Sequence, residues 1–252
     1  MTINNRRIRV NDVELNIVTQ GEGPAVLLVH GFPDDHTVWR NQIPARSSRA
    51  RATTRSRSLW RIWLHYSMRS GSQKCGSSAT TGGRCKGWCF AVQHPKRVDR
   101  YIAMSVGHPG AYVSAGLAQK LKGYYLFCIQ LRGLIEFLVT RFDWWLFGLL
   151  LHYPAEFPHI RARLSRPGRL TAGFNYYRAN LRSMHSKVFP RVKVPVVGIW
   201  SDSDIFLTED QMSGSERYCD AGFRYFRIDG ANHWLQLTTP EKLNPLLLQL
   251  LH

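Results

Sequence analysis

Acidic residues are scarce in this chain, and one long stretch has none. The 252 residues include 17 Asp and Glu against 34 Lys and Arg, a formal net charge of +17. No acidic residue lies between Asp35 and Asp99. Residues 46–86 alone carry eight Arg, two Lys, nine Ser and four Thr, so 41 residues hold +10 and the other 211 only +7. Because the rest of the chain is only mildly basic, we do not expect the protein to bind nucleic acid.

Long apolar runs, a leader-like start and a paired cysteine pattern are also missing. The most apolar run, 144–151, has eight residues, whereas a membrane-spanning helix needs about 20, so we expect no membrane span. The first residues have charges but no apolar run behind them, which argues against a secretory signal. Cysteines number five, and no second pair follows Cys85 and Cys89 at a zinc-site spacing. We therefore expect no metal, no cofactor and a reduced, cytoplasmic protein.

The sequence patterns that are present indicate an α/β protein. Apolar runs with strand character alternate with helical patterns, which predicts a mostly parallel sheet flanked by helices. The predicted strands are 8–10, 13–17, 25–29, 98–106, 195–200 and 224–228; the predicted helices are the one that ends near 93 and the one at 240–251. Residues 108–190 are aromatic-rich and helical in period. Residues 46–86 have no sustained period, and we expect them to be irregular or disordered.

Two polar residues follow consecutive predicted strands. Asp204 comes just after the strand at 195–200, and His233 comes just after the strand at 224–228. Turns after successive parallel strands lie on one edge of a sheet, so we expect the carboxylate to reach the imidazole. A carboxylate on Nδ1 fixes the tautomer of a histidine and leaves Nε2 free as a base. The alternative is an ordinary polar histidine at the surface.

A short turn follows the first buried strand. Residues 30–33, His-Gly-Phe-Pro, come directly after the apolar run 25–29. Backbone N–H groups in such a turn can point at an oxyanion, an interaction worth about 3 kcal/mol in the transition state. We therefore predict that the Phe32 N–H forms part of an oxyanion hole.

Taken together, these motifs resemble those of the epoxide hydrolase group of α/β-hydrolases, which is related to the haloalkane dehalogenases. The likeness covers residues 8–45 and 88–252. Its motifs are His30–Pro33 with Trp39 and 42–44, the stretch 93–98, Tyr125 five residues before Gln130, the sequence Asn-Tyr-Tyr-Arg at 175–178, Asp204, and His233 with Trp234.

The resemblance implies a fold, a reaction and a set of roles. It implies an α/β-hydrolase core in two parts, 1–107 and 191–252, with a helical cap inserted at 108–190. In this family an Asp attacks the epoxide carbon, and a histidine with its acid partner activates the water that hydrolyses the ester. It implies that Tyr125 and Tyr177 hydrogen-bond the epoxide oxygen, although plain cap packing is the alternative for these rings. It also implies His233 as base, Asp204 as its orienting acid, and Pro33, Trp39 and Trp234 as contacts for a small apolar substrate.

The family's nucleophile has no counterpart. The expected Gly-X-Asp-X-Gly elbow falls where the chain has Ser-Ala-Thr-Thr-Gly-Gly at 78–83. A serine elbow is not present either, because 76–80 lacks the closing glycine and no apolar strand precedes it. We therefore assign no nucleophile, and the activity of the chain as written is in question.

A change of reading frame accounts for the anomaly. Codons for Gly-His-Asp-Trp-Gly read one base later can give Ala-Thr-Thr-Gly-Gly, the sequence at 79–83. A GC-rich gene read out of frame also yields excess Arg, Ser and Thr and few acids. Our hypothesis is a frame change near Ala45 and a second one near Lys86 that restores the frame, with some residues lost.

Three other readings stay open. One is an inactive pseudoenzyme that binds an apolar ligand in the cap. Another is a nucleic-acid or membrane-surface binder that uses the basic segment 46–86, although that segment has only Trp60, Trp63 and Tyr66 for stacking. The third is a haloalkane dehalogenase, which often places Asn where Phe32 stands and needs no tyrosine pair.

Overall fold

The computed structural model describes most of the chain in two compact units. It describes residues 4–10, 13–21, 25–43, 63–65, 86–153, 155–180 and 189–251. The first unit takes its described residues from 1–69, 201–203 and 227–252, and the second from 70–200 and 204–226. No helix within these described ranges is both long and apolar enough to cross a membrane.

The N-terminal sheet belongs to the first unit and begins with the predicted hairpin. Its strands are β1 (Asn4–Val10), β2 (Val13–Thr19), β4 (Trp63–His65) and β3 (Leu28–Val29), in the order β1-β2-β4-β3. β1 and β2 are antiparallel, with Val10 opposite Val13. β4 is antiparallel to β2 and parallel to β3. The apolar run predicted as a strand at 25–29 is thus a strand only at its end.

Composition did not predict β4, which lies within the basic segment. It is a three-residue strand hydrogen-bonded on both sides. Lys86, the last residue of that segment, is the first residue of α1 (Lys86–Gln93). The rest of 46–86, including the position expected for the nucleophile at 78–83, lies outside the described residues.

Short helices complete the first unit. η1 (His36–Trp39) begins after Asp35, whose Oδ1 accepts hydrogen bonds from the Thr37 N–H at 2.9 Å and the Thr37 hydroxyl at 2.5 Å. α9 (Leu235–Thr238) leads into α10 (Pro240–Leu251), which confirms the predicted closing helix. The residues that α10 buries, Leu243, Leu247 and Leu250, are three or four apart, as on one face of a helix.

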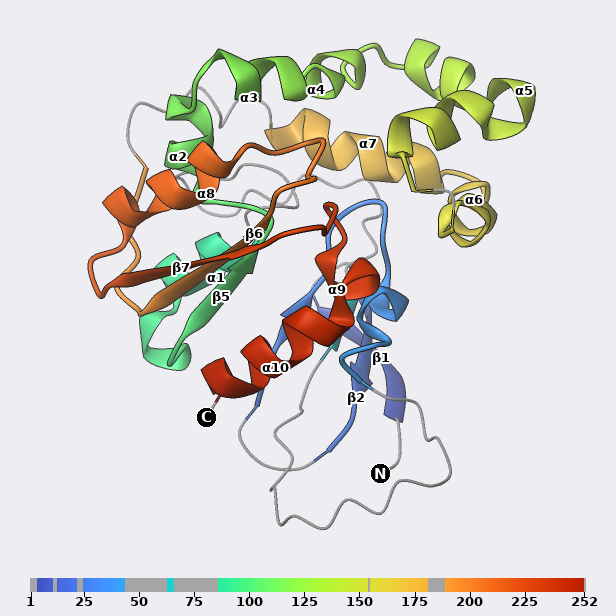
Figure 1. The fold of residues 1–252 in the computed structure, drawn as a ribbon. Coiled ribbons are helices and arrows are strands. Elements are labelled where there is room, and N and C mark those ends of the chain that lie inside the picture. The colour runs from blue at the N-terminus through green and yellow to red at the C-terminus, as the bar shows by residue number, and fades with distance from the viewer. Residues whose placement is uncertain are drawn as a thin grey trace. The chain divides into compact units, whose positions relative to one another are not determined.

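The second sheet contains the buried strands predicted late in the sequence. Its order is β5 (Tyr101–Met104), β6 (Val196–Ser201) and β7 (Phe223–Ile228), and β5 is parallel to β6 (Figure 1). All six residues of β6 are buried, as a continuous apolar run predicts for a central strand. β5 is shorter than the predicted 98–106, since η3 (Pro95–Arg97) precedes it and Ser105 takes a positive φ of 61° after it.

The remaining described elements of the second unit are helical. They are α2 (Pro109–Ser114), α3 (Leu117–Lys122), α4 (Tyr125–Cys128), α5 (Leu134–Leu151), α6 (Phe157–Leu164), α7 (Arg169–Asn180), α8 (Glu209–Ser213) and η5 (Gly214–Tyr218). Between β5 and β6 the described elements are thus all helices, in agreement with the helical pattern at 108–190. The core joins Trp88 and Ala91 of α1 to Ala103 of β5 and to Val196 and Trp200 of β6.

Candidate active site

The predicted histidine lies in a turn after β7, in the first unit. Gly230 begins the turn with a positive φ of 78°, a backbone conformation that glycine adopts readily. Asn232 Oδ1 accepts a hydrogen bond from the Trp234 N–H at 2.8 Å. The His233 ring stands edge-on to the Trp234 ring, with centroids 5.2 Å apart and planes at 90°. Because the Trp234 side chain is 3% exposed, one wall of the histidine's surroundings is a fixed indole.

The same indole is hydrogen-bonded to the predicted oxyanion turn. Trp234 Nε1 donates to the Asp34 carboxylate, 3.1 Å from Oδ1 and 3.0 Å from Oδ2. The Asp34 N–H donates to the Gly31 carbonyl at 3.0 Å and closes the turn. The first unit therefore brings the turn of Phe32 and Pro33 and the histidine loop together through Asp34. The sequence did not predict this role of Asp34, because no local pattern indicates that its carboxylate accepts a hydrogen bond from a residue 200 positions away.

The turn after β6 is hydrogen-bonded to the turn that carries His233. The Ser201 hydroxyl donates to the Asn232 carbonyl at 2.8 Å, the Ser203 N–H donates to the Ala231 carbonyl at 3.2 Å, and the Gly230 N–H donates to Asp202 Oδ1 at 2.8 Å. These hydrogen bonds join the residues just before Asp204 to those just before His233. A contact between Asp204 and His233 themselves stays a prediction.

Asp204 is a buried carboxylate that two backbone amides orient. It is 1% exposed, and its Oδ1 accepts from the Phe206 N–H at 2.8 Å and the Leu207 N–H at 3.0 Å. The Lys122 ammonium at the end of α3 donates to the Asp204 carbonyl at 2.5 Å. Gln119 of α3 donates to the Phe206 carbonyl at 3.1 Å. Two side chains of α3 therefore hold the loop that carries the acid.

The two predicted tyrosines face each other in the second unit. Tyr125 on α4 and Tyr177 on α7 have ring centroids 6.3 Å apart and planes at 88°. Tyr125 also stands edge-on to Phe206, at 5.8 Å. The tyrosine pair and the acid loop therefore belong to one aromatic cluster, in which Phe206 is two residues from Asp204. A role of the two phenols in the reaction stays a prediction.

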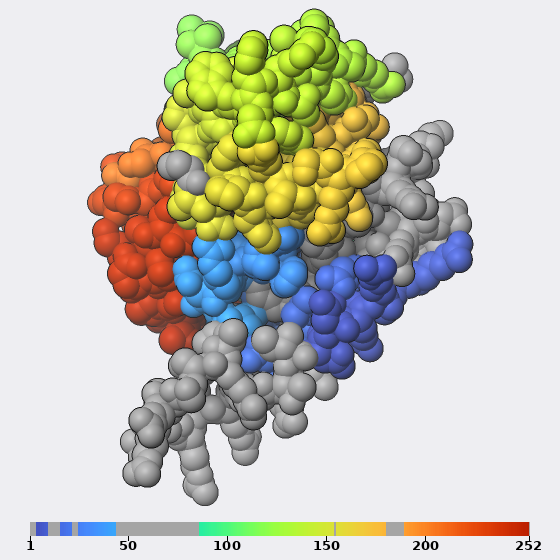
Figure 2. Space-filling model, turned by 90° about the vertical axis from the view of Figure 1, so that its right-hand side faces the viewer, coloured from blue at the N-terminus to red at the C-terminus, as the bar shows by residue number. Residues whose placement is uncertain are grey.

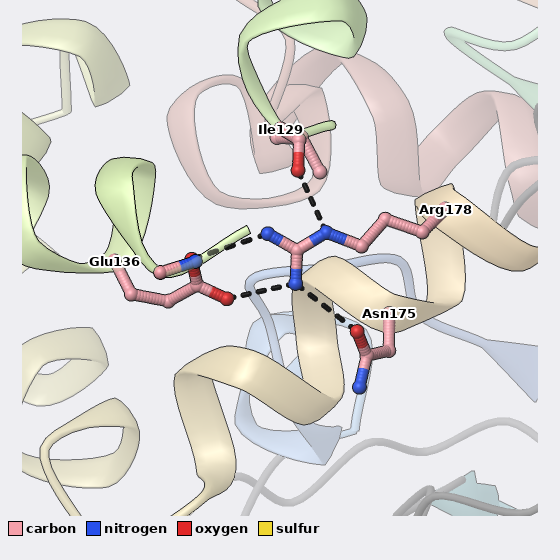
Figure 3. A network of polar contacts seen from close by, with 5 residues as sticks. Ile129, Glu136, Asn175 and Arg178 are labelled. Carbon is pink, nitrogen blue, oxygen red and sulfur yellow. Dashed lines mark hydrogen bonds and ion pairs between the residues drawn. The ribbon is translucent and has the colours of Figure 1, made fainter. Parts of the chain in front are cut away.

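An ion pair between Arg178 of α7 and Glu136 of α5 lies next to these tyrosines in the chain fold (Figure 3). Arg178, next to Tyr177 on α7, donates Nη1 to Glu136 Oε1 at 2.7 Å and Nη2 to Glu136 Oε2 at 3.1 Å. Its Nε donates to the Ile129 carbonyl at 2.7 Å, and the Ile129 N–H donates to the Tyr125 carbonyl at 2.9 Å. One guanidinium therefore links the helix of Tyr177 to the helical turn that starts at Tyr125. Sequence reasoning noted Arg178 only as part of a motif.

A lysine approaches the same aromatic cluster. The Lys86 ammonium lies 4.6 Å from the centroid of the Tyr176 ring, and the Tyr176 ring is 5.8 Å from that of Tyr177. Burial lowers the pKa of Lys86 to about 8. Lys86 lay in the segment that composition predicted to be irregular, so this contact was not foreseen.

The other predicted substrate contacts lie in the first unit. Pro33, Trp39 and Trp234 are buried there. The Phe32–Pro33 peptide bond is cis. Among the described residues, no group of three or more His, Cys, Asp or Glu side chains is arranged to hold a metal ion.

Comparisons with known proteins agree with this architecture. No family model matches the chain. It is 26% identical to Epoxide hydrolase 3 of Xenopus tropicalis over 277 residues, covering 96% of this chain and 75% of the relative. It is 24% identical to the AB hydrolase superfamily protein YfhM of Bacillus subtilis, covering 97% and 96% of the two chains.

A solved structure supports the same fold. The Bacillus megaterium epoxide hydrolase, crystallised in complex with an inhibitor, superimposes with a TM-score of 0.77 at 21% identity and covers 98% of this chain and 99% of that one. The chain therefore has the α/β-hydrolase fold, and its sequence is similar to those of proteins named epoxide hydrolase and AB hydrolase.

Proposed function

We propose that the gene encodes an epoxide hydrolase that converts a small apolar epoxide to a diol by way of an ester. The observation that carries this proposal is the Tyr125–Tyr177 pair, whose rings are 6.3 Å apart beside the acid loop at Phe206. Two phenol O–H groups on adjacent helices can both donate to one epoxide oxygen while the ring opens. A haloalkane dehalogenase needs no such pair, which favours the epoxide.

The proposed roles follow the family reaction. A carboxylate oxygen attacks an epoxide carbon, the carbon–oxygen bond breaks, and the tyrosines stabilise the alkoxide that forms. His233 then takes a proton from water, and the hydroxide attacks the ester carbonyl and regenerates the carboxylate; the proton that His233 holds goes to the alkoxide oxygen, which completes the diol. Asp204 orients the imidazole, and the Phe32 N–H stabilises the oxyanion. Pro33, Trp39 and Trp234 line the substrate's path, and 108–190 forms a cap between core parts 1–107 and 191–252.

We propose further that the chain as written does not form the ester, because it has no carboxylate at the elbow. The alignment with the Xenopus protein spans 277 residues, whereas this chain has 252 in all. At least 25 positions of the relative therefore have no counterpart here, which supports the loss of residues. The run without acids from 36 to 98 supports a shifted reading frame.

The nucleotide sequence of codons 44–90, translated in all three frames, tests this directly. If another frame spells Gly-X-Asp-Trp-Gly, the repaired protein should hydrolyse an aryl epoxide such as styrene oxide, while the chain as written should not. Tyr125→Phe and Tyr177→Phe in the repaired protein should each lower kcat for the epoxide. If no frame spells the motif, the frame hypothesis fails and the pseudoenzyme reading replaces it.

The pseudoenzyme reading has its own measurement. Calorimetric titration of the chain as written with styrene oxide, and with the diol, should show binding without product. Turnover by the chain as written would contradict the proposal that it forms no ester and would exclude the pseudoenzyme reading, because it would require a nucleophile that we have not assigned.

A further inference from the structure

The helices α3, α4 and α5 expose an unusual amount of apolar surface. Large apolar side chains on these helices and their connections are exposed by 41% to 83%. We call this set the apolar stripe; it consists of Leu117, Leu121, Tyr124, Phe127, Leu131, Leu134, Phe137, Leu138, Phe142, Trp145 and Leu149. Single exposed apolar residues are normal on a protein surface, but large contiguous apolar patches usually mark a binding surface.

The members of the stripe follow one another closely along the chain. From Leu117 to Leu149, members of the stripe recur every three or four positions apart from the adjacent pair Phe137 and Leu138, and α3, α4 and α5 follow one another along the second unit (Figure 1). The opposite side of α5 is buried through Ile135, Val139 and Phe147. α5 is thus apolar on its outer as well as its inner face, whereas a surface helix normally has a polar outer face.

The end of α5 extends the exposed surface. The helix bends at 141–144, where Phe142 has a φ of 48° and is 83% exposed. Trp145, 62% exposed, follows the bend. Figure 2 shows the atoms of α5, yellow-green, at the surface of the second unit, with those of α6, yellow, beside them. An aromatic side chain that is mostly exposed suits the boundary between water and lipid, where aromatic rings concentrate.

The charge on this surface is positive. Lys120, Arg132 and Arg141 are exposed among the residues of the stripe. The two acids of the same helices are both in ion pairs, Glu136 with Arg178 and Asp143 with Arg161. The stripe therefore combines apolar side chains with a basic border.

We propose that the apolar stripe binds the surface of an anionic lipid bilayer. Helices with exposed Leu, Phe and Trp and flanking Lys and Arg lie in the headgroup region, with affinity that depends on buried apolar area and on attraction to anionic lipids. A second copy of this chain is the weaker fit, because a two-fold contact must be self-complementary and the acids of this surface that could face Lys120, Arg132 and Arg141 are already in ion pairs. Anionic headgroups instead neutralise these charges. The binding needs no catalysis, so it stands apart from the proposed function.

Vesicle co-sedimentation of the full chain tests the proposal. We expect the chain to bind phosphatidylcholine vesicles that contain about 30% phosphatidylglycerol and to bind pure phosphatidylcholine at least about tenfold more weakly. The variant Phe127→Gln/Leu134→Gln/Phe142→Asn should lose binding by about tenfold or more. Asn suits position 142 because it tolerates a positive φ.

Matched controls separate the stripe from general apolar or basic surface. Leu27→Gln/Leu248→Gln removes exposed apolar side chains outside the stripe and should bind as the parent does. Lys120→Gln/Arg132→Gln should weaken binding, whereas Lys96→Gln/Arg97→Gln, which removes two exposed charges elsewhere, should not. Unchanged circular dichroism melting curves confirm that each variant folds.

Two outcomes overturn the proposal. The first is binding that the triple variant keeps and that about 0.5 M salt abolishes, which would assign it to charge alone and to another surface such as the basic segment 46–86. The second is absence of vesicle binding together with a dimer that the triple variant dissociates in sedimentation velocity, which would make the stripe a contact between copies.

Discussion

Arg178 and Glu136 form a bidentate ion pair that joins α7 to the start of α5. The distances are 2.7 Å for Nη1–Oε1 and 3.1 Å for Nη2–Oε2, and the side chains are 4% and 16% exposed. Although burial acts in the opposite direction, the Arg178 guanidinium holds the pKa of Glu136 below its usual value. Since Arg178 also binds the Ile129 carbonyl, the pair determines how the helix of Tyr177 meets that of Tyr125.

Arg178→Met should destabilise the chain by about 3 kcal/mol, because it removes the cationic partner of the half-buried Glu136 carboxylate. Asp143→Asn breaks the exposed Arg161 pair, whose side chains are 39% and 73% exposed, and should cost less than about 1 kcal/mol. Urea unfolding followed by tryptophan fluorescence measures both. Equal effects of the two substitutions would show that burial of the Arg178 pair contributes nothing.

Asp34→Ala should destabilise the histidine loop by about 1 to 3 kcal/mol, since it leaves the Trp234 indole N–H without its carboxylate acceptor. Asp34→Asn retains one oxygen acceptor and should recover much of this loss. Hydrogen exchange of the amides of 231–235 locates the effect. An Asp34→Ala protein in which these amides exchange at the parent rate would contradict the role of Asp34.

Gly107→Ala should be strongly destabilising, because a Cβ there would overlap the Gln211 carbonyl oxygen. The Gly107 N–H also donates to Gln211 Oε1 at 2.5 Å, so the backbones cannot separate without losing that bond. Gly116→Ala meets no atom within 4 Å and should change stability by less than about 1 kcal/mol. Melting temperatures of the two variants provide the test; similar values would refute the close approach at Gly107.

Stability should fall in mild acid because of His108. The Gly110 N–H donates to His108 Nδ1 at 3.1 Å, and Nε2 lies 3.1 Å from the Pro190 carbonyl, so the neutral ring with a proton on Nε2 satisfies both contacts. Burial lowers the pKa of His108 to about 4. The unfolded chain, with a histidine pKa of about 6.5, takes up the proton first, so stability is lost as pH falls from about 6.5 toward 4.

Between pH 7 and pH 5 this loss should amount to about 2 kcal/mol. Urea midpoints at the two pH values measure it, and His108→Asn should reduce the difference, because an amide retains the acceptor for the Gly110 N–H without titrating near pH 6. An unchanged pH dependence in this variant would assign the effect to other groups.

Apolar runs and helical spacing in the sequence correctly predicted individual strands and helices. The apolar run of β6 and the three-four spacing of α10 were recognised correctly, since a buried strand and an amphipathic helix are each written in consecutive residues. The fold class followed from the alternation of these elements. The length of the strand predicted at 25–29 was overestimated, because apolar residues alone do not show whether a neighbouring strand is long enough to pair with all of them.

Only the tertiary structure decided which distant residues meet. Tyr125 and Tyr177 were proposed as a pair by resemblance, but their edge-on contact depends on how α4 and α7 pack. Asp34 and Trp234 are 200 positions apart, and the Arg178–Glu136 pair joins two helices. Sequence periodicity records which side of an element is apolar, not which partner covers it. That is why the apolar stripe of α3–α5, which by spacing alone resembles core, was recognised as exposed surface only from the packed structure.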